Sequence, residues 1–203
     1  MTTAIAYPPA AGLPRPHRVR IVTVPDRRCL AIDGDGEPGG AEFQGAMGAL
    51  YRAAYALHFL LRERGIDARI GPSEALWERR DGAPAWAEGS VAFDPKAWRW
   101  TLLLAVPVEA SDDDIASALA IARRKHPSPA LAHLYVMTIR EGVTVEALHV
   151  GPYDTEPETI GKMHQAAREA GLRPHGPHHE IYLGDPRRGD PQLLRTVLRQ
   201  PVH

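Results

Sequence analysis

The segment HHEIYL, residues 178–183, has the residue types of an acid–base site on one β-strand. Side chains alternate between the two faces of a strand, so Glu180 and Tyr182 share one face while His179 and Ile181 share the other. If Ile181 packs under helices, Glu180 and Tyr182 project into an uncovered groove. Desolvation there raises the pKa of a carboxyl and suits it to act as a base or to bind a cation. The alternative is a solvated strand face with ordinary polar residues.

Aromatic residues are the second group of candidates, in a chain with only 6% aromatic content. They fall in two clusters, one on an expected helix and one in the segment after it: Tyr51, Tyr55, His58 and Phe59, then Trp77, Trp86, Trp98 and Trp100. Such rings could line a pocket for a flat, apolar ligand, because aromatic faces stack on ligand rings. The alternative, which the pattern alone favours, is core packing together with loop anchoring.

The histidines do not predict a metal centre. The spacing His175-x-x-His178-His179 lacks a cysteine, and two adjacent strand residues face opposite ways, whereas zinc requires three or four converging ligands. His149 and His164 are ambiguous, and histidines in such positions are more often structural than catalytic. No glycine-rich nucleotide motif and no GxSxG motif is present, so we expect no cofactor.

Composition limits the possible functions further. The 203 residues contain 24 Lys+Arg and 25 Asp+Glu, a net charge of −1, which argues against a non-specific nucleic-acid or anionic-membrane binder. No apolar run approaches the roughly 20 residues of a membrane span, and the N-terminus has no signal-peptide pattern. The single Cys29 excludes an internal disulfide and is expected to be a small buried residue. We therefore expect a cytoplasmic globular protein whose oligomeric state is open.

The elements that must position these residues follow from periodicity and capping signals. Residues 1–17 are rich in Ala and Pro and are expected to be a disordered tail. Apolar residues three and four apart predict a helix over 41–64 that ends at Gly65, and Thr155-x-x-Glu158 is typical of a capping box for a later helix. Strands are expected near 18–32, 74–80, 98–107, 131–150, 178–183 and 193–202.

This order contains β-α-β-β twice, over about 18–107 and 143–202, with a helical insertion over about 111–126. Two such units in one domain of residues 18–202 predict an α+β fold. We expect a curved antiparallel sheet with helices on one face and a ligand groove on the other.

Several strings resemble the GyrI-like small-molecule-binding family. In the C-terminal half they are HVGPYDTEPETIGKMHQAAREAGL, HHEIYLGDPRR and LLRTVLRQPV, and in the N-terminal half AEFQGAMGALYRAAYALHFLLRERG, ALWERR and WRWTLLLAVP. The resemblance covers about residues 18–202. It implies two SHS2-like modules around a concave groove, where Glu180 matches a glutamate that meets cationic aromatic drugs in some transcription activators. No helix-turn-helix precedes the fold here, so the regulator role is not implied.

Within the stand-alone branch, the sequence is similar to enzymes that hydrolyse the cyclopropane of spirocyclopropyl-cyclohexadienone antibiotics. This resemblance implies Glu180 as the base for water, a tyrosine (Tyr182, Tyr55 or Tyr153) as the donor to the developing phenolate, and tryptophans as walls. The expected catalytic residues are Glu180 and Tyr182. The expected contacts of a small hydrophobic aromatic ligand are Tyr55, Phe59, Trp77, Trp100, His149 and Tyr153. The alternative is a non-catalytic module that sequesters drugs or binds a partner protein such as a topoisomerase.

Overall fold

The computed structural model describes residues 12–16, 18–82, 97–185 and 190–203. Trp86 and most of the expected tail therefore lie outside the described residues. At the end of that tail, Pro16 forms an isolated bridge with Leu148, and the Gly12 carbonyl accepts a hydrogen bond from Arg20. This short segment is held against the sheet.

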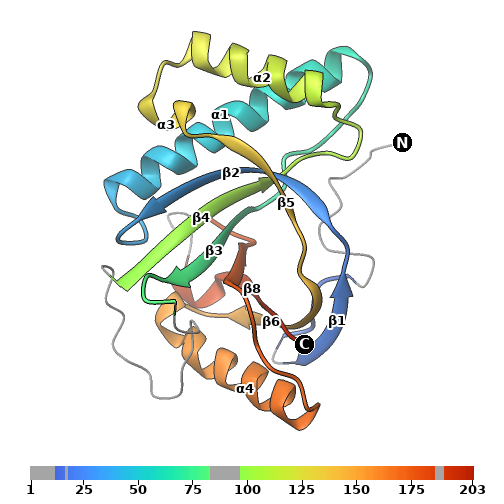
Figure 1. The fold of residues 1–203 in the computed structure, drawn as a ribbon, viewed down its shortest axis with the longest axis vertical. Helices are drawn as coiled ribbons and strands as arrows, with labels where there is room; N and C mark the ends of the chain where they lie inside the picture. The colour runs from blue at the N-terminus through green and yellow to red at the C-terminus, as the bar shows by residue number, and fades with distance from the viewer. Residues whose placement is uncertain (1–11, 17, 83–96, 186–189) are drawn as a thin grey trace.

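Eight strands form one antiparallel sheet in the order β1-β6-β8-β7-β3-β4-β2-β5 (Figure 1). The strands are β1 Val19–Val24, β2 Arg27–Asp35, β3 Ser73–Arg79, β4 Trp98–Ala105, β5 Tyr135–Ile139, β6 Gly142–Val150, β7 His178–Tyr182 and β8 Arg195–Pro201. Short links join β1 to β2 and β5 to β6, although the two strands of each pair lie near opposite edges of the sheet. The sheet curls strongly to allow these links. The α+β class and the curved antiparallel sheet are thus confirmed.

The helices are α1 Ala41–Glu63, α2 Asp112–Lys125, α3 Pro129–Ala132 and α4 Glu156–Glu169. Ser111 forms a full capping box with Asp114 at the start of α2. The expected capping box at Thr155 is absent, because residues Tyr153–Thr155 already form a 3-10 turn. The Thr155 hydroxyl donates instead to the Pro152 carbonyl at 2.7 Å.

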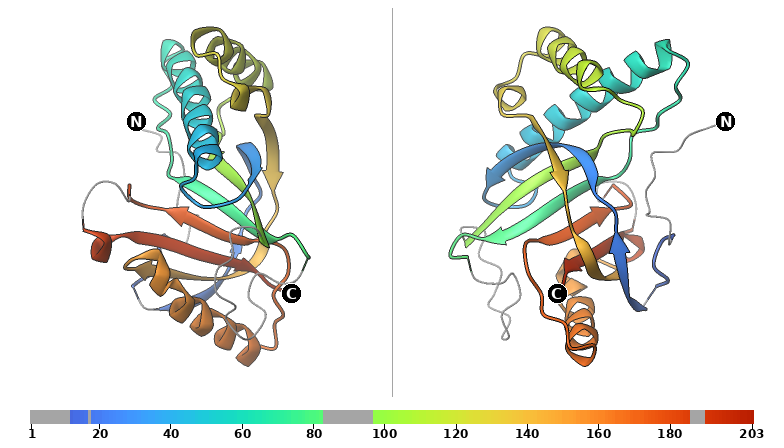
Figure 2. Two further views of the ribbon diagram at one scale, coloured as in Figure 1. Left: turned by 90° about the vertical axis from the view of Figure 1, so that its left-hand side faces the viewer. Right: turned by 45° about the vertical axis from the view of Figure 1, so that its right-hand side comes forward.

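The two main helices cover different parts of the sheet. α1 packs on β2 and β4, and α4 packs on β6 and β1. Figure 2 shows α1 and α4 at opposite ends of the molecule, with the central strands between them. In the described part of the chain, no helix has the length and apolar character needed to cross a membrane.

The β-α-β-β order appears in the structure as β2-α1-β3-β4 and β6-α4-β7-β8, and the remaining two strands are exchanged between the halves. β1, which the sequence analysis placed in the first module, pairs with β6 of the second half. β5 pairs with β2 of the first half. Edge pairing over a long sequence separation leaves no local signal, so the sequence pattern could not reveal this exchange.

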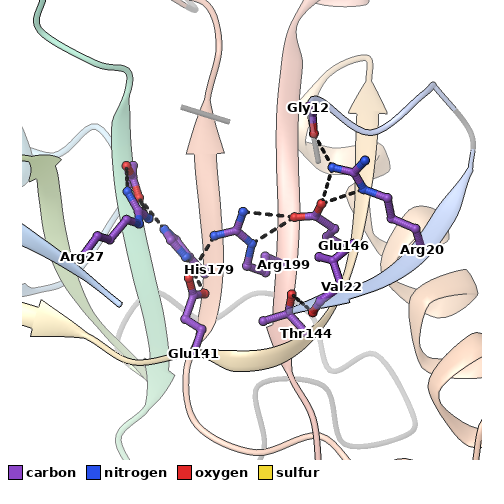
Figure 3. A network of polar contacts seen from close by, with 10 residues as sticks. Gly12, Arg20, Val22, Arg27, Glu141, Thr144, Glu146, His179 and Arg199 are labelled. Carbon is purple, nitrogen blue, oxygen red and sulfur yellow. Dashed lines mark hydrogen bonds and ion pairs between the residues drawn. The ribbon is translucent and has the colours of Figure 1, made fainter. Parts of the chain in front are cut away.

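The face of the sheet turned away from the helices carries a buried chain of alternating charges (Figure 3). Its members, in order of contact, are Arg27, Glu74, His179, Glu141, Arg199, Glu146 and Arg20. Glu141 lies in the β5–β6 link and reaches His179 on β7 and Arg199 on β8, at 2.8 and 2.9 Å. The chain of charges therefore ties this link to the middle of the sheet.

Candidate functional site

Glu180 is the one charged residue in a row of small and apolar side chains that crosses the sheet. Residues paired directly across an antiparallel sheet share a face. The row reads Ile32, Leu102, Ala75, Glu180, Leu198, Ala147 and Val19. Its apolar members belong to the cores beneath α1 and α4. Glu180 and Tyr182 therefore face the helix side, between the two cores.

This arrangement reverses the expected orientation of β7. Ile181 was expected under the helices, but it packs with Leu148 and Val197 on the opposite face. The expectation failed because both faces of β7 are buried. His179 shares the face of Ile181 and is buried there because it forms ion pairs with two carboxylates. The alternation of polar and apolar residues therefore does not identify which face of β7 the helices cover.

A line of hydrogen bonds supports the Glu180 carboxylate. The Tyr182 hydroxyl donates to Glu180 Oε2 at 2.7 Å, and Trp77 Nε1–H donates to the Tyr182 hydroxyl at 3.3 Å. Burial raises the pKa of Glu180 to about 6, while the Tyr182 hydrogen bond and the nearby Trp77 N–H act in the other direction. Glu180 is thus ionised at neutral pH and has a pKa suited to a general base.

Two neighbouring groups stay uncharged at neutral pH. Burial and then the charge of Glu180 raise the pKa of Tyr182 well above its ordinary value. Burial lowers the pKa of His178 to about 3, so its Nε2, 3.7 Å from Glu180 Oε1, carries no positive charge. His178 therefore does not serve as a cationic partner of the Glu180 carboxylate.

Aromatic rings stand beside the carboxylate. Phe43 stacks on Trp77 with ring centroids 6.3 Å apart and meets Trp100 edge-on at 5.3 Å. Tyr153 meets Tyr182 edge-on at 5.9 Å. Trp77 contacts Tyr182 through its hydrogen bond, and both Trp77, 6% exposed, and Trp100, 2% exposed, belong to the core beneath α1. Phe43 was interpreted only as part of the apolar stripe of α1.

A second carboxyl, Glu156, was not singled out from the sequence. It is the first residue of α4, only 5% exposed, and its Oε1 has no hydrogen-bond partner among the described residues. Burial and then the charge of Glu180 raise its pKa well above the ordinary value. A glutamate in the first helical turn is common, so the sequence carried no sign of this burial.

The other proposed ligand contacts are placed elsewhere or are already engaged. Tyr55 and Phe59 are both 53% exposed, and Tyr55 is about 18 Å along α1 from Phe43, so they do not join Glu180. His149 is buried, with its ring nitrogens 2.9 Å from the Thr159 hydroxyl and 3.1 Å from the Pro152 carbonyl. His149 thus fixes the turn before α4.

Metal and thiol chemistry receive no support from the part of the chain that the structure describes. No group of three or more His, Cys, Asp or Glu residues there could hold a metal ion. Cys29 is buried, and burial raises the pKa of its thiol to about 12. The cysteine therefore stays a protonated, inert core residue.

A sequence model of the GyrI-like small molecule binding domain matches residues 107–203. An uncharacterized conserved protein from Listeria innocua has a similar structure with TM-score 0.83 and 31% identity, over 97% of this chain and 95% of that chain. This chain belongs to the GyrI-like family. The resemblance to the GyrI-like family is confirmed, and with it a domain of a kind that binds small molecules.

Two further solved structures are similar to this chain to different degrees. A Listeria innocua protein described as a hydrolase shares 30% identity, with TM-score 0.79, over 97% of this chain and 94% of that chain. The C-terminal domain of EcmrR has TM-score 0.56 at 11% identity, over 92% of this chain and 97% of that chain, and shows the shared fold alone. No curated protein matches the sequence.

Proposed function

We propose that this GyrI-like protein binds flat, hydrophobic xenobiotics beside Trp77, Tyr182 and Tyr153, and hydrolyses the cyclopropane of spirocyclopropyl-cyclohexadienones. The observation that carries the proposal is a carboxylate in an apolar row, Glu180, with a pKa of about 6 and a hydrogen bond from Tyr182. The hydrolase description of a relative at 30% identity supports this class of reaction.

The proposed reaction needs one base and one proton donor. Glu180 takes a proton from water as the water oxygen attacks the cyclopropane methylene carbon. The bond from that carbon to the spiro carbon breaks, and its electron pair makes the ring aromatic. The dienone oxygen becomes a phenolate and takes a proton, so the product equals the substrate plus one water. Release of ring strain and gain of aromaticity provide the driving force.

The neighbouring residues have separate tasks in this scheme. Tyr182 orients Glu180 and keeps it ionised, because a hydrogen bond to a carboxylate favours the charged form. The rings of Trp77, Phe43 and Tyr153 offer aromatic surface for a planar substrate. Positioning of water against the strained carbon adds to the effect of the base.

The test is incubation of the purified protein with such a compound, followed by mass detection of a one-water gain. Wild type is compared with Glu180→Gln and with the control Glu78→Gln, which changes an exposed carboxylate on β3. We expect the gain in wild type and Glu78→Gln only. Hydrolysis by Glu180→Gln at the wild-type rate would contradict the mechanism.

A non-catalytic binder is the second candidate, because a carboxylate among aromatic rings also suits a cationic aromatic drug. In the same experiment, this candidate predicts no water adduct in any variant but protection of the compound from added nucleophiles. Absence of both hydrolysis and binding would contradict both candidates.

A further inference from the structure

The scheme above does not say which group protonates the phenolate. The Tyr182 hydroxyl is engaged with Glu180 at 2.7 Å, and a donor bound to the base is poorly placed to serve the substrate as well. Tyr153 has a pKa raised to about 12, by burial and by the charges of Glu156 and Glu180, which makes it a weak acid. Neither tyrosine is therefore a good proton donor at neutral pH.

Glu156 lies on the same side of the sheet as these groups. Thr196 on β8 is the cross-strand partner of Tyr182, so both face the helix side, and the Thr196 side chain is close enough to Glu156 to act on its pKa. Tyr153, three residues before Glu156, contacts the Tyr182 ring. The start of α4 thus brings a second carboxyl to the Glu180–Tyr182 pair.

The two carboxyls have different surroundings. Glu180 accepts a hydrogen bond from Tyr182, which stabilises its charged form. Glu156 is more than nine-tenths buried and its Oε1 accepts no hydrogen bond from the described residues; burial and the charge of Glu180 act against its ionisation and outweigh the Thr196 side chain, which favours it. Carboxyls whose surroundings separate their pKa values in this way are typical of an acid and a base working together.

We propose that Glu156 is the second catalytic carboxyl, which donates the proton to the substrate oxygen that becomes the phenol while Glu180 deprotonates water. The inference rests on the proposed function and assigns the proton donor of that reaction. It changes the role of Tyr182 from candidate acid to positioning residue.

The protons balance over one turnover. Glu180 gains the proton that water loses when its oxygen bonds to carbon. Glu156 loses its proton to the dienone oxygen as the carbon–carbon bond breaks. Each turnover therefore leaves Glu180 protonated and Glu156 ionised, and exchange with solvent restores both. No oxidant, reductant or metal is required.

Several titratable groups surround this pair. From β7 they are Tyr182, His178 and His179, from the turn before α4 Tyr153, from α4 His164, and from β6 His149. Asp185 acts on Tyr153. Both tyrosines have raised pKa values, and His178 is neutral. The proposal therefore assigns the pH dependence of the rate to the two carboxyls that exchange protons in the reaction, Glu180 and Glu156, while His179, whose pKa is also raised, lies on the other face of β7.

The experiment compares wild type, Glu156→Gln and the control Glu158→Gln, which changes an exposed carboxylate in the same helical turn. The substrates are spirocyclopropyl-cyclohexadienones whose product phenols differ in acidity. We expect Glu156→Gln to lose about 10²- to 10⁴-fold in kcat. In its profile of rate against pH, the decline below about pH 6 should remain and the decline at alkaline pH should disappear. Its rate should also depend strongly on the acidity of the product phenol. Glu158→Gln should behave as wild type.

Other results overturn the inference. A slow Glu156→Gln variant that keeps the alkaline limb and a weak dependence on phenol acidity would show a structural role. If wild type gives no water adduct, the proposed function fails and this role fails with it; an adduct with unaltered Glu156→Gln kinetics overturns the role alone.

A measurement on wild type guards against a variant that does not fold. Infrared spectra should show the carbonyl band of a protonated carboxyl that persists above pH 7, after Glu180 has ionised. Absence of this band above pH 7 would overturn the proton-donor role, since Glu156 would then have no proton to give.

Discussion

Glu180 and Tyr182 point to the same side of β7, and the hydroxyl of Tyr182 donates a 2.7 Å hydrogen bond to the carboxylate of Glu180. The alternation of a strand makes this contact possible, because residues two apart project from one face. The contact opposes the rise in the pKa of Glu180 that burial causes. It therefore connects strand geometry directly to the pH range in which the base works.

The acid limb of the rate profile should report Glu180. The pKa of this carboxyl is raised to about 6, so the base loses its function as pH falls through that value. We expect kcat/KM to fall about tenfold per pH unit below pH 6 and to be level just above it. The measurement is initial rate of water-adduct formation against pH with substrate below KM. A wild-type profile that stays level down to pH 4.5 would contradict Glu180 as the base.

Tyr182→Phe should shift that limb toward higher pH. The substitution removes a hydrogen bond that favours the ionised carboxylate, so the pKa of Glu180 rises. A hydrogen bond to a charged group contributes about 1.5–3 kcal/mol, which corresponds to a shift of at least about one pH unit. Rate profiles of the variant and wild type measure the shift. Tyr55→Phe, which changes an exposed residue of α1, is the control and should not move the limb.

The sequence predicted that Glu180 and Tyr182 lie on one face of their strand, because residue types and strand period are both local signals. It did not predict the helix-facing side of β7, since that choice depends on whether His179 finds ionic partners in β3 and in the β5–β6 link. Those partners lie 105 and 38 residues away in the chain. No local pattern can supply them.

The same limit explains the other differences. Trp77 and Trp100 were grouped as possible walls because they are close in the sequence, but only their cross-strand register shows Trp100 lying over Gly34 in the core. Glu156 looked like an ordinary residue of a helix start. Its burial arises from tertiary packing of α4 near β8, which capping and dipole arguments do not contain.

Gly34→Ala should destabilise the fold and disturb the aromatic cluster. An added Cβ would lie 2.1 Å from the Trp100 ring, so the ring must move, and with it Phe43, which meets it edge-on. Overpacking of this kind costs about 1–3 kcal/mol of the free energy of unfolding. Denaturant titration measures it. The control is Gly45→Ala on α1, where the added Cβ meets nothing within 4 Å; it should stabilise by about 0.5–1 kcal/mol. Equal effects of the two substitutions would contradict the close packing at Gly34.

His179 should make stability depend on pH. Its Nδ1 and Nε2 are each 2.8 Å from a carboxylate, Glu141 and Glu74, and carboxylates only accept, so the ring carries both protons. Burial acts to lower the pKa of His179, but the two carboxylates outweigh it and raise the pKa above 6.5. A raised histidine pKa stabilises the fold fully below the unfolded value and loses this contribution as pH rises through the folded value.

Glu74 and Glu141, the two carboxylates bound to His179, make stability depend on pH in the opposite sense. Burial acts to raise the pKa of Glu74 and Glu141, but Arg27, His179 and Arg199 outweigh it and hold both near 2. Their contribution is present above about 4.5 and is lost as pH falls toward 2. These three groups together therefore place maximum stability between about pH 4.5 and 6.5.

Urea unfolding across pH 3 to 9 measures this profile. His179→Gln should lower the free energy of unfolding by about 3–5 kcal/mol near pH 6, because it removes one partner of buried carboxylates, and should flatten the decline above pH 6.5. The exposed His133→Gln is the control and should keep the wild-type profile. If His179→Gln shows the same alkaline decline as wild type, the decline comes from another group and the doubly protonated His179 is wrong. His179 is the direct neighbour of Glu180 on β7, so the same variant also tests whether the buried charges hold that strand in place. If they do, His179→Gln should lose the alkaline decline in stability and should also have a lower kcat at unchanged KM.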